Sequence, residues 1–339
     1  PFVIGEVQLT KDGEMLDNWT LVDKMISYVK SLFGFSKKNL EGVEFTIYAK
    51  EDIVHPDGIS GIMFKAGDIV STGVRSSEKQ AIETTDASGI ATFKELYLGK
   101  YVMKETKTID GFNLDVQPKD LTFAYVDGNT SPVKATIGDI QWTNERQKVH
   151  IEIAKRDQDT NKPISGAVFE LHNETAIKNA NGDVIVQKGT LLETSESDDN
   201  GIAVFESDLP LGKYYVIEQT APKGYTLSND MIQIDASYRT DTNIINVNKD
   251  FFNEITKVRI EKYAEDTNEL LKGATLAVYH NNDLIEQWIT DDKPHEIRGL
   301  LVGETYTLKE VKPSDGYTTV EDITFTVMDR NPKTGEYKG

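Results

Sequence analysis

Three lysines occupy equivalent places in strand-like segments, each on the apolar side of its segment. The segments are residues 7–11, 149–155 and 258–262, in which apolar and polar side chains alternate. Successive side chains of a β-strand point to opposite faces, so Lys11, Lys155 and Lys262 are predicted to point into a core. A buried ammonium is costly unless it is paired or loses its charge. Three such lysines in a repeat therefore call for a chemical reason.

A glutamate with the same anomaly follows each lysine, at the end of a strand-like segment that begins near a tyrosine. Glu105 shares one predicted strand face with Tyr101 and Met103. Glu310 has the same setting, and Glu218 occupies the matching place in a segment that is apolar on both faces. We therefore expect these carboxyl groups to face the same interiors as the lysines.

The first two repeats also end in a segment that turns an asparagine inward. Asn144 has the parity of Ile140 and Trp142, and Asn253 has the parity of Phe251. Any one of these polar residues is also compatible with a strand edge where its polar tip reaches water. The repetition of all three types favours a buried amine, acid and carboxamide in each of the two cores.

This trio permits one specific reaction. Burial in an apolar site lowers the pKa of a lysine, and the neutral amine is a nucleophile. The asparagine offers a carboxamide carbon, and a protonated glutamate can polarise the carbonyl and pass protons to the leaving ammonia. The product is an amide crosslink between two side chains, in which every buried group is neutral.

The order Lys…Gly-Ala-x-Phe…Tyr-x-x-x-Glu…Gly-Tyr…Asn resembles a known family. It is similar to the CnaB-type (SpaA-type, prealbumin-like) immunoglobulin-like domains of adhesins and pilins on Gram-positive cells. The resemblance implies an all-β protein of three tandem β-sandwiches in an extended rod. The repeat predicts the domains as residues 1–146, 147–255 and 256–339.

The same resemblance implies which residues react. Domains of this family form intramolecular Lys–Asn or Lys–Asp isopeptide bonds with a catalytic acid. Carried onto this sequence, that implies one bond between Lys11 and Asn144 promoted by Glu105, and another between Lys155 and Asn253 promoted by Glu218. Asn248 is a weaker acceptor candidate in the second domain.

The third repeat departs from this pattern. It has Lys262 and the catalytic candidate Glu310, but no later strand supplies an asparagine or aspartate, since Asp329 follows Val327 too closely. Two explanations remain open: the chain stops before its last strand, or an external strand completes the domain. Under either explanation we expect Lys262 to be unbonded.

The first repeat contains an insertion. The lysine and the glycine that opens the next strand are 31 residues apart there and 11 apart in the other two repeats. Apolar residues spaced at i, i+4, i+7 and i+8 predict an amphipathic helix over about residues 18–37. Asn18 or Thr20 would cap it and Gly34 would end it. Its apolar face would pack on its own domain, or would dock a neighbouring domain or a ligand.

Composition limits the partners. The chain has 339 residues, a net charge of −19 and no cysteine. The negative charge argues against nucleic acid or an anionic membrane, and no apolar run is long enough to insert in a membrane. The five histidines lack metal-ligand spacing, so we predict no metal and no cofactor. Since no disulfide can form, any covalent stabilisation of the domains would have to come from another kind of crosslink.

These observations predict a structural stalk of a Gram-positive surface adhesin or pilus-like protein, stabilised against force and proteolysis. The crosslinking is a single self-modification, so no enzyme activity is expected. We expect an extracellular fragment of a longer protein, attached to the cell wall through a segment outside it, with neighbouring domains as partners. The alternative is an adhesin module that binds a host matrix protein or glycan through the first-domain insertion. A polymerising pilin subunit is a third possibility.

Overall fold

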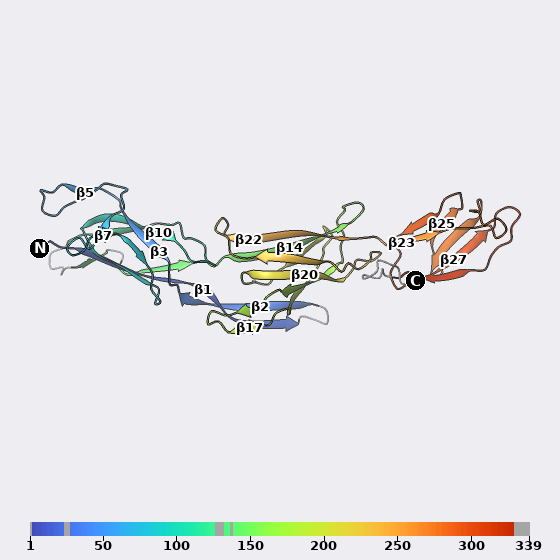
Figure 1. The fold of residues 1–339 in the computed structure, drawn as a ribbon, viewed down its shortest axis with the longest axis horizontal. Helices are drawn as coiled ribbons and strands as arrows, with labels where there is room; N and C mark the ends of the chain where they lie inside the picture. Colours follow the sequence, from blue (N-terminus) through green and yellow to red (C-terminus); the bar gives the residue numbers. More distant parts are fainter. Residues whose placement is uncertain (1, 24–27, 126–131, 136–137, 329–339) are drawn as a thin grey trace.

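The computed structural model describes residues 2–23, 28–125, 132–135 and 138–328. Their regular structure consists of β-strands alone, and no helix long and apolar enough to cross a bilayer occurs in these residues. The strands form three sandwiches that follow one another along the long axis of the molecule (Figure 1). The expected all-β fold and its three domains are therefore confirmed.

The first domain packs one sheet around β1 against a second sheet, β11-β10-β3-β8. In the first sheet, β12 and β13 run parallel to β1, and β2 and β9 run antiparallel to it. The strands are β1 (Gly5–Asp23), β2 (Val29–Asn39), β3 (Glu44–Ala49), β4 (Ile53–Val54), β5 (Ile62–Phe64), β6 (Ser71–Thr72), β7 (Lys79–Gln80), β8 (Ile82–Thr84), β9 (Ile90–Leu96), β10 (Gly99–Lys107), β11 (Lys119–Phe123), β12 (Val133–Lys134) and β13 (Ile140–Asn144).

The second domain packs the sheet β19-β14-β22 against the sheet β18-β15-β20-β21. Its strands are β14 (Lys148–Asp157), β15 (Val168–Asn173), β16 (Ile177–Lys178), β17 (Val184–Val186), β18 (Leu191–Glu196), β19 (Ile202–Phe205), β20 (Gly212–Thr220), β21 (Met231–Ala236) and β22 (Ile244–Asn253). The first strand, β14, runs parallel to the last strand, β22, as β1 runs parallel to β13.

The third domain repeats this plan with fewer described strands. The pair β23-β26 faces the sheet β25-β24-β27-β28. The strands are β23 (Lys257–Ile260), β24 (Thr275–His280), β25 (Asp283–Ile289), β26 (His295–Arg298), β27 (Thr305–Lys312) and β28 (Ile323–Thr326). Within residues 256–328, β23 pairs only with the antiparallel strand β26. The corresponding first strands of the other two domains, β1 and β14, each pair in addition with a parallel last strand, β13 and β22.

The alternation of burial along the strands follows the sequence pattern. On β13 the buried residues are Ile140, Trp142 and Asn144, and the residues between them are exposed. On β10, Tyr101, Met103 and Glu105 alternate with less buried neighbours. The period of two therefore places a polar side chain in the same interior as the aromatic and aliphatic ones.

The predicted helix over residues 18–37 is wrong. These residues belong to a long hairpin of β1 and β2, in which Trp19 pairs with Phe33 and Asn18 pairs with Gly34. The supposed cap and end residues are thus partners across a ladder. At Gly34 an added Cβ would lie 2.4 Å from the Asn18 side chain, which explains the glycine without a helix. Met25 and Ile26, which contributed to the helical spacing, lie outside the described residues.

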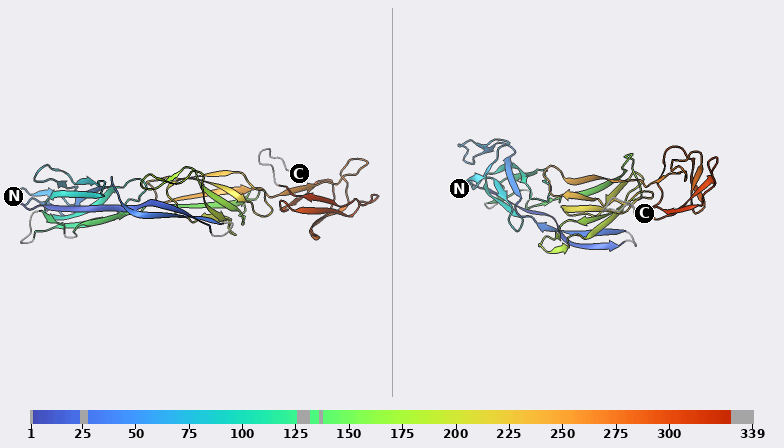
Figure 2. Two further views of the ribbon diagram at one scale, coloured as in Figure 1. Left: turned by 90° about the horizontal axis from the view of Figure 1, so that it is seen from below. Right: turned by 45° about the vertical axis from the view of Figure 1, so that its right-hand side comes forward.

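The hairpin forms extended strands because it packs against the surface of the second β-sandwich. Leu16 and Phe33 join the apolar core of the second domain, and Trp19 and Phe35 pack against that core. Aromatic and β-branched residues suit such a pleated surface, and this packing outweighs a helical spacing of apolar residues. The insertion therefore leaves its own domain and contacts the neighbouring one (Figure 2).

Candidate functional site

The parallel pairing of first and last strands brings a lysine and an asparagine to one face. Lys11 pairs with Trp142 in the β1–β13 ladder, and Asn144 lies two residues further along β13. Because residues two apart share a face, the Lys11 and Asn144 side chains both enter the interior of the first domain. Glu105 reaches the same place from β10 in the facing sheet.

These three side chains form a closed hydrogen-bonded group. The Nζ atom of Lys11 lies 2.8 Å from Oε2 of Glu105 and 2.5 Å from Oδ1 of Asn144. The Nδ2 atom of Asn144 donates to Oε1 of Glu105 at 2.6 Å and to Oγ1 of Thr108 at 2.9 Å. The amine therefore lies beside the amide oxygen, while the carboxyl group contacts both nitrogens.

Aromatic rings enclose the amine. The Phe45 and Trp142 rings have their centroids 5.7 Å from the Nζ atom of Lys11, and the lysine side chain is 0% exposed. Burial lowers the pKa of Lys11 below the ordinary lysine value of 10.5, although the hydrogen bond and charge of Glu105 oppose that shift. The site thus favours the neutral amine more than water does.

The second domain repeats the arrangement with one difference. Lys155 pairs with Phe251, and Asn253 lies two residues further along β22. The Nζ atom of Lys155 is 3.8 Å from Oε1 of Glu218 and donates to the carbonyl oxygen of Phe251 at 3.3 Å. Its contact with the carboxylate is therefore looser than that of Lys11.

The amide of Asn253 is held firmly by its nitrogen. Its Nδ2 atom donates to both carboxylate oxygens of Glu218, at 2.9 and 2.8 Å, and to the carbonyl oxygen of Thr226 at 2.9 Å. Its Oδ1 atom is buried without a hydrogen-bond partner. An unpaired buried oxygen raises the free energy of the unreacted state.

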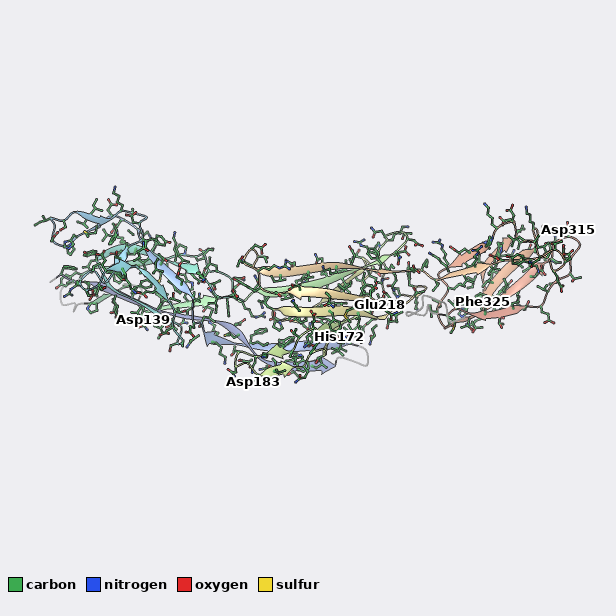
Figure 3. All side chains as sticks on the ribbon, viewed as in Figure 1. Asp139, His172, Asp183, Glu218, Asp315 and Phe325 are labelled. Atoms are coloured by element: carbon green, nitrogen blue, oxygen red, sulfur yellow. The ribbon has the colours of Figure 1, made fainter. Side chains whose placement is uncertain are left out.

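Burial also governs the charge of the second lysine. Lys155 is 0% exposed, and the centroid of the Phe251 ring lies 5.2 Å from its Nζ atom. Desolvation lowers the pKa of Lys155 from 10.5 to about 8, against the charges of Glu218 and Asp157. A substantial fraction of this amine is therefore neutral near pH 8. Figure 3 marks Glu218 in the second domain.

The third domain contains the amine and the acid. The Nζ atom of Lys262 lies 3.2 Å from Oε1 of Glu310, and the lysine side chain is 16% exposed. The backbone N–H of Val320 donates to Oε2 of Glu310 at 2.9 Å, as that of Ser228 does to Glu218. No carboxamide from residues 256–328 is recorded in contact with this pair, and Asp329 lies outside the described residues.

Some residues of these sites were not anticipated from the sequence. Thr108 and the carbonyl of Thr226 hold the amide nitrogens, and they come from loops that no alternation identifies. An aromatic residue, Trp142 or Phe251, stands two places before each asparagine and therefore on the same strand face. This spacing could have predicted the aromatic ring beside each lysine amine. The weaker candidate Asn248 is exposed on β22.

The sequence matches the family described as the SpaA prealbumin-like fold domain over residues 35–139, 149–250 and 256–338. The chain belongs to this family. The three matched segments correspond to the three sandwiches. A comparison with curated protein sequences found no match.

A solved structure with a TM-score above 0.5 shows the same fold at low sequence identity, and others match with lower TM-scores. The Bacillus anthracis TIE protein is 20% identical with a TM-score of 0.55, and the match covers 96% of this chain and 49% of that one. This chain thus spans about half the length of the TIE protein. BcpA, the major pilin subunit of Bacillus cereus, is 12% identical over 97% of this chain and 96% of its own, with a TM-score of 0.40. The major pilin SpaD of Corynebacterium diphtheriae is 15% identical over 96% and 92%, with a TM-score of 0.33.

Proposed function

We propose that this chain is part of a structural stalk on a Gram-positive cell surface, stiffened by two spontaneous Lys–Asn isopeptide bonds. The bonds would join Lys11 to Asn144 and Lys155 to Asn253. The observation that carries the proposal is that one buried carboxyl group contacts both the lysine amine and the asparagine amide nitrogen in each of two separate cores. Membership of the SpaA prealbumin-like family supports the cell-surface setting, and attachment to the cell wall through a segment outside these residues is part of the proposal.

The reaction proceeds from the neutral amine. The Nζ atom attacks Cγ of the asparagine, and the Nζ–Cγ bond forms as the amide oxygen takes up charge. The glutamate carboxyl group, which contacts both nitrogens, takes a proton from Nζ and passes one to Nδ2, so that the carbonyl re-forms as the nitrogen leaves. The Cγ–Nδ2 bond breaks and ammonia leaves. Each site reacts once, so the chain modifies itself and is not an enzyme.

The bonds lie where pulling would otherwise separate strands. The crosslinked residues sit on the first and last strands of each domain, through which the chain enters and leaves. Lys11 and Asn144 are 133 residues apart in sequence. Closing a loop of that size stabilises a domain by about 4–5 kcal/mol if the loop-entropy relation for disulfides holds for an amide. A stalk gains both stiffness and resistance to proteases.

We propose that the third domain is completed by a strand from outside the described residues. A cavity of about 210 Å³ lies beside β23, lined by residues 256–258 and 325–328. The corresponding side of β14 is occupied by β22, which also contacts β21, the counterpart of β28. Figure 3 marks Phe325 at the end of the domain nearest the second domain. An incoming parallel strand would need an amide or acid side chain facing Lys262.

The structure gives the adhesin alternative less support. It required the first-domain insertion to bind a host matrix protein or glycan, but Phe33 and Leu16 of that insertion are buried against the second domain. Ligand binding through this insertion would need the hairpin to leave that core. Deleting residues 18–37 and measuring binding to matrix proteins and glycans separates this alternative from the stalk.

A single-molecule pulling experiment tests the stalk function. With the chain held at its two ends, the wild-type first and second domains should not extend. The Glu105→Gln variant should release the 133-residue loop of the first domain, a gain of roughly 450 Å. Equal extension of the wild-type and variant proteins would contradict the proposal.

A further inference from the structure

The β1–β2 hairpin is shared between two domains. Its ladder runs from Asp12 paired with Asn39 to Asp23 paired with Val29. The part near Asp12 belongs to the first domain, since Lys11 pairs with β13 immediately before it. The remainder lies along the second domain, as the blue strands in Figure 2 show.

The hairpin covers the edge at which both sheets of the second domain end. β18 is the end strand of one sheet and β19 is the end strand of the other. On β2, the Val29 N–H donates to Oγ1 of Thr194 at 2.9 Å, and Ser31 Oγ donates to the carbonyl oxygen of Leu192 at 2.8 Å. The Ser31 N–H also donates to Oγ of Ser207, just beyond β19, at 3.2 Å. Backbone groups of an open strand edge are a template for unwanted pairing. One of these contacts engages such a group, the Leu192 carbonyl, and the other two end on side chains of the edge.

The second domain in turn holds the other strand of the hairpin. The Ala180 N–H, in the turn between β16 and β17, donates to the carbonyl oxygen of Leu16 at 2.8 Å. The neighbouring Asn179 side chain donates to the carbonyl oxygen of Asp17 at 3.4 Å. Figure 3 marks Asp183 in this same turn region beside the hairpin. Polar contacts therefore hold both strands, in addition to the apolar contacts of Phe33 and Leu16.

The short connection between the two domains is fastened to the hairpin as well. The Arg146 guanidinium lies 3.6 Å from the centroid of the Phe35 ring on β2 and forms an ion pair with Asp208 of the second domain. Arg146 is buried, and its Nε atom lies 3.9 Å from Glu14 on β1. One linker side chain thus joins the hairpin to the second domain.

The junction between the second and third domains is built differently. Its recorded ion pairs join Asp159 to Lys257 at 2.9 Å and to Arg298 at 3.4 Å, on partly exposed side chains. Partly exposed ion pairs of this kind contribute little to stability, because water and salt screen them. Thr256 adds buried hydrogen bonds to the carbonyl oxygens of Gly224 and Leu300. No described strand crosses from one of these domains to cover the other.

We propose that the hairpin is a strap by which the first domain caps the second, so that the two form one rigid, cooperative unit. Bending of the rod is then concentrated at the junction with the third domain. The strap also keeps the β18–β19 edge from pairing with the same edge of a second copy. This inference does not require the isopeptide bonds, because it rests on contacts between the domains.

Amide hydrogen exchange of the full chain tests the strap when a buried and an exposed neighbouring residue of the hairpin are each replaced by alanine. Phe33 is 9% exposed and lies in the second-domain core, whereas Leu32 is 54% exposed. The Phe33→Ala variant should accelerate exchange of the amides in residues 191–207 at least tenfold, on the order expected when a buried ring is removed. The Leu32→Ala variant should leave these rates unchanged, and neither variant should affect residues 275–312.

Two outcomes would overturn the strap. One is unchanged exchange at residues 191–207 in Phe33→Ala, and the other is an equal acceleration in Leu32→Ala. If Phe33→Ala does not fold, Ser31→Ala removes the hydrogen bond to Leu192 together with the one that Ser31 Oγ accepts from the Trp19 indole within the hairpin, and it should accelerate the same amides severalfold. The absence of any acceleration in Ser31→Ala would then count against the proposal.

Discussion

Asn253 lies two residues beyond Phe251, the residue that pairs with Lys155 across two parallel strands. Asn144 has the same relation to Trp142 and Lys11 in the first domain. This register places amine and amide on one face of the sheet, and the facing sheet supplies the glutamate. Two independent sites with one register, one set of residue types and one degree of burial support a common chemistry.

The acid is the group whose loss should stop the reaction without removing either reacting partner. In Glu105→Gln we expect no crosslink in the first domain and an intact one in the second. The free energy of unfolding of the unit that contains the first domain should fall by about 4–5 kcal/mol through the open loop alone. Urea unfolding followed by tryptophan fluorescence, with Trp142 in this core, measures the change.

The matched control for the glutamate is Glu152→Gln, since Glu152 is partly exposed on β14 and contacts His150. It should leave both crosslinks and the unfolding midpoint unchanged. Crosslinking that persisted in Glu105→Gln would rule out the proposed role of the acid.

Replacing the acceptor by the corresponding acid offers a stricter test of the bond itself. In Asn253→Asp, Lys155 should still form the amide, with water leaving in place of ammonia. The final product is then chemically identical to the wild-type crosslinked protein, so the two should have equal masses. A variant that stays heavier than the wild type, even after prolonged incubation, would show that this carboxyl group does not react.

The sequence predicted the interior of the sites better than it predicted their surroundings. Period-two alternation placed Lys11, Glu105 and Asn144 on buried faces, because the side chains of a strand must alternate whatever the neighbouring domain. Alternation is local, so it could not identify Thr108, which reaches the Asn144 amide from a loop.

The hairpin was mispredicted for a related reason. Leu21, Val29 and Phe33 have a helical spacing, but they lie in a β-ladder, and Phe33 packs on a surface that belongs to another domain. A pattern of apolar residues indicates that a segment is buried, but it does not indicate which part of the protein covers the segment. The second-domain edge that covers Phe33 is more than 150 residues away in the chain, as its contacts at Ser31 with Leu192 show.

The lowered pKa of Lys155 gives a pH-dependent stability in protein that cannot react. In Asn253→Ala the amine stays free, and the folded state loses its proton near pH 8 while the unfolded state keeps it to about 10.5. The unfolded state therefore binds more protons between these values, and the free energy of unfolding should rise with pH across this window. Well below pH 8, where the amine is protonated in both states, the stability contribution of this group should be constant.

The wild-type protein is the control for that titration, since an amide does not ionise in this range. Urea midpoints of the unit that contains the second domain, measured at pH 8 and pH 10, should differ more in Asn253→Ala than in the wild type. Equal differences would mean that Lys155 titrates normally or is free in both proteins.

Lys262 should differ chemically from the other two lysines. With no described amide beside it, its amine should remain free, so it should be acetylated in denaturant, and in a separate, unacetylated sample trypsin should cleave after it. Lys11 and Lys155 should resist both modification and cleavage under the same conditions because their nitrogens are amides. Peptide mapping after acetylation distinguishes them, and a modified Lys155 in wild-type protein would contradict the crosslink.

The central claim is tested most directly by the intact mass of the wild-type chain under denaturing conditions. The account predicts a deficit of two molecules of ammonia relative to the mass calculated from the sequence. Digestion should yield two branched peptides, one joining Lys11 to Asn144 and one joining Lys155 to Asn253. A mass equal to the calculated one would show that neither bond forms, and the stalk proposal would lose its chemical basis.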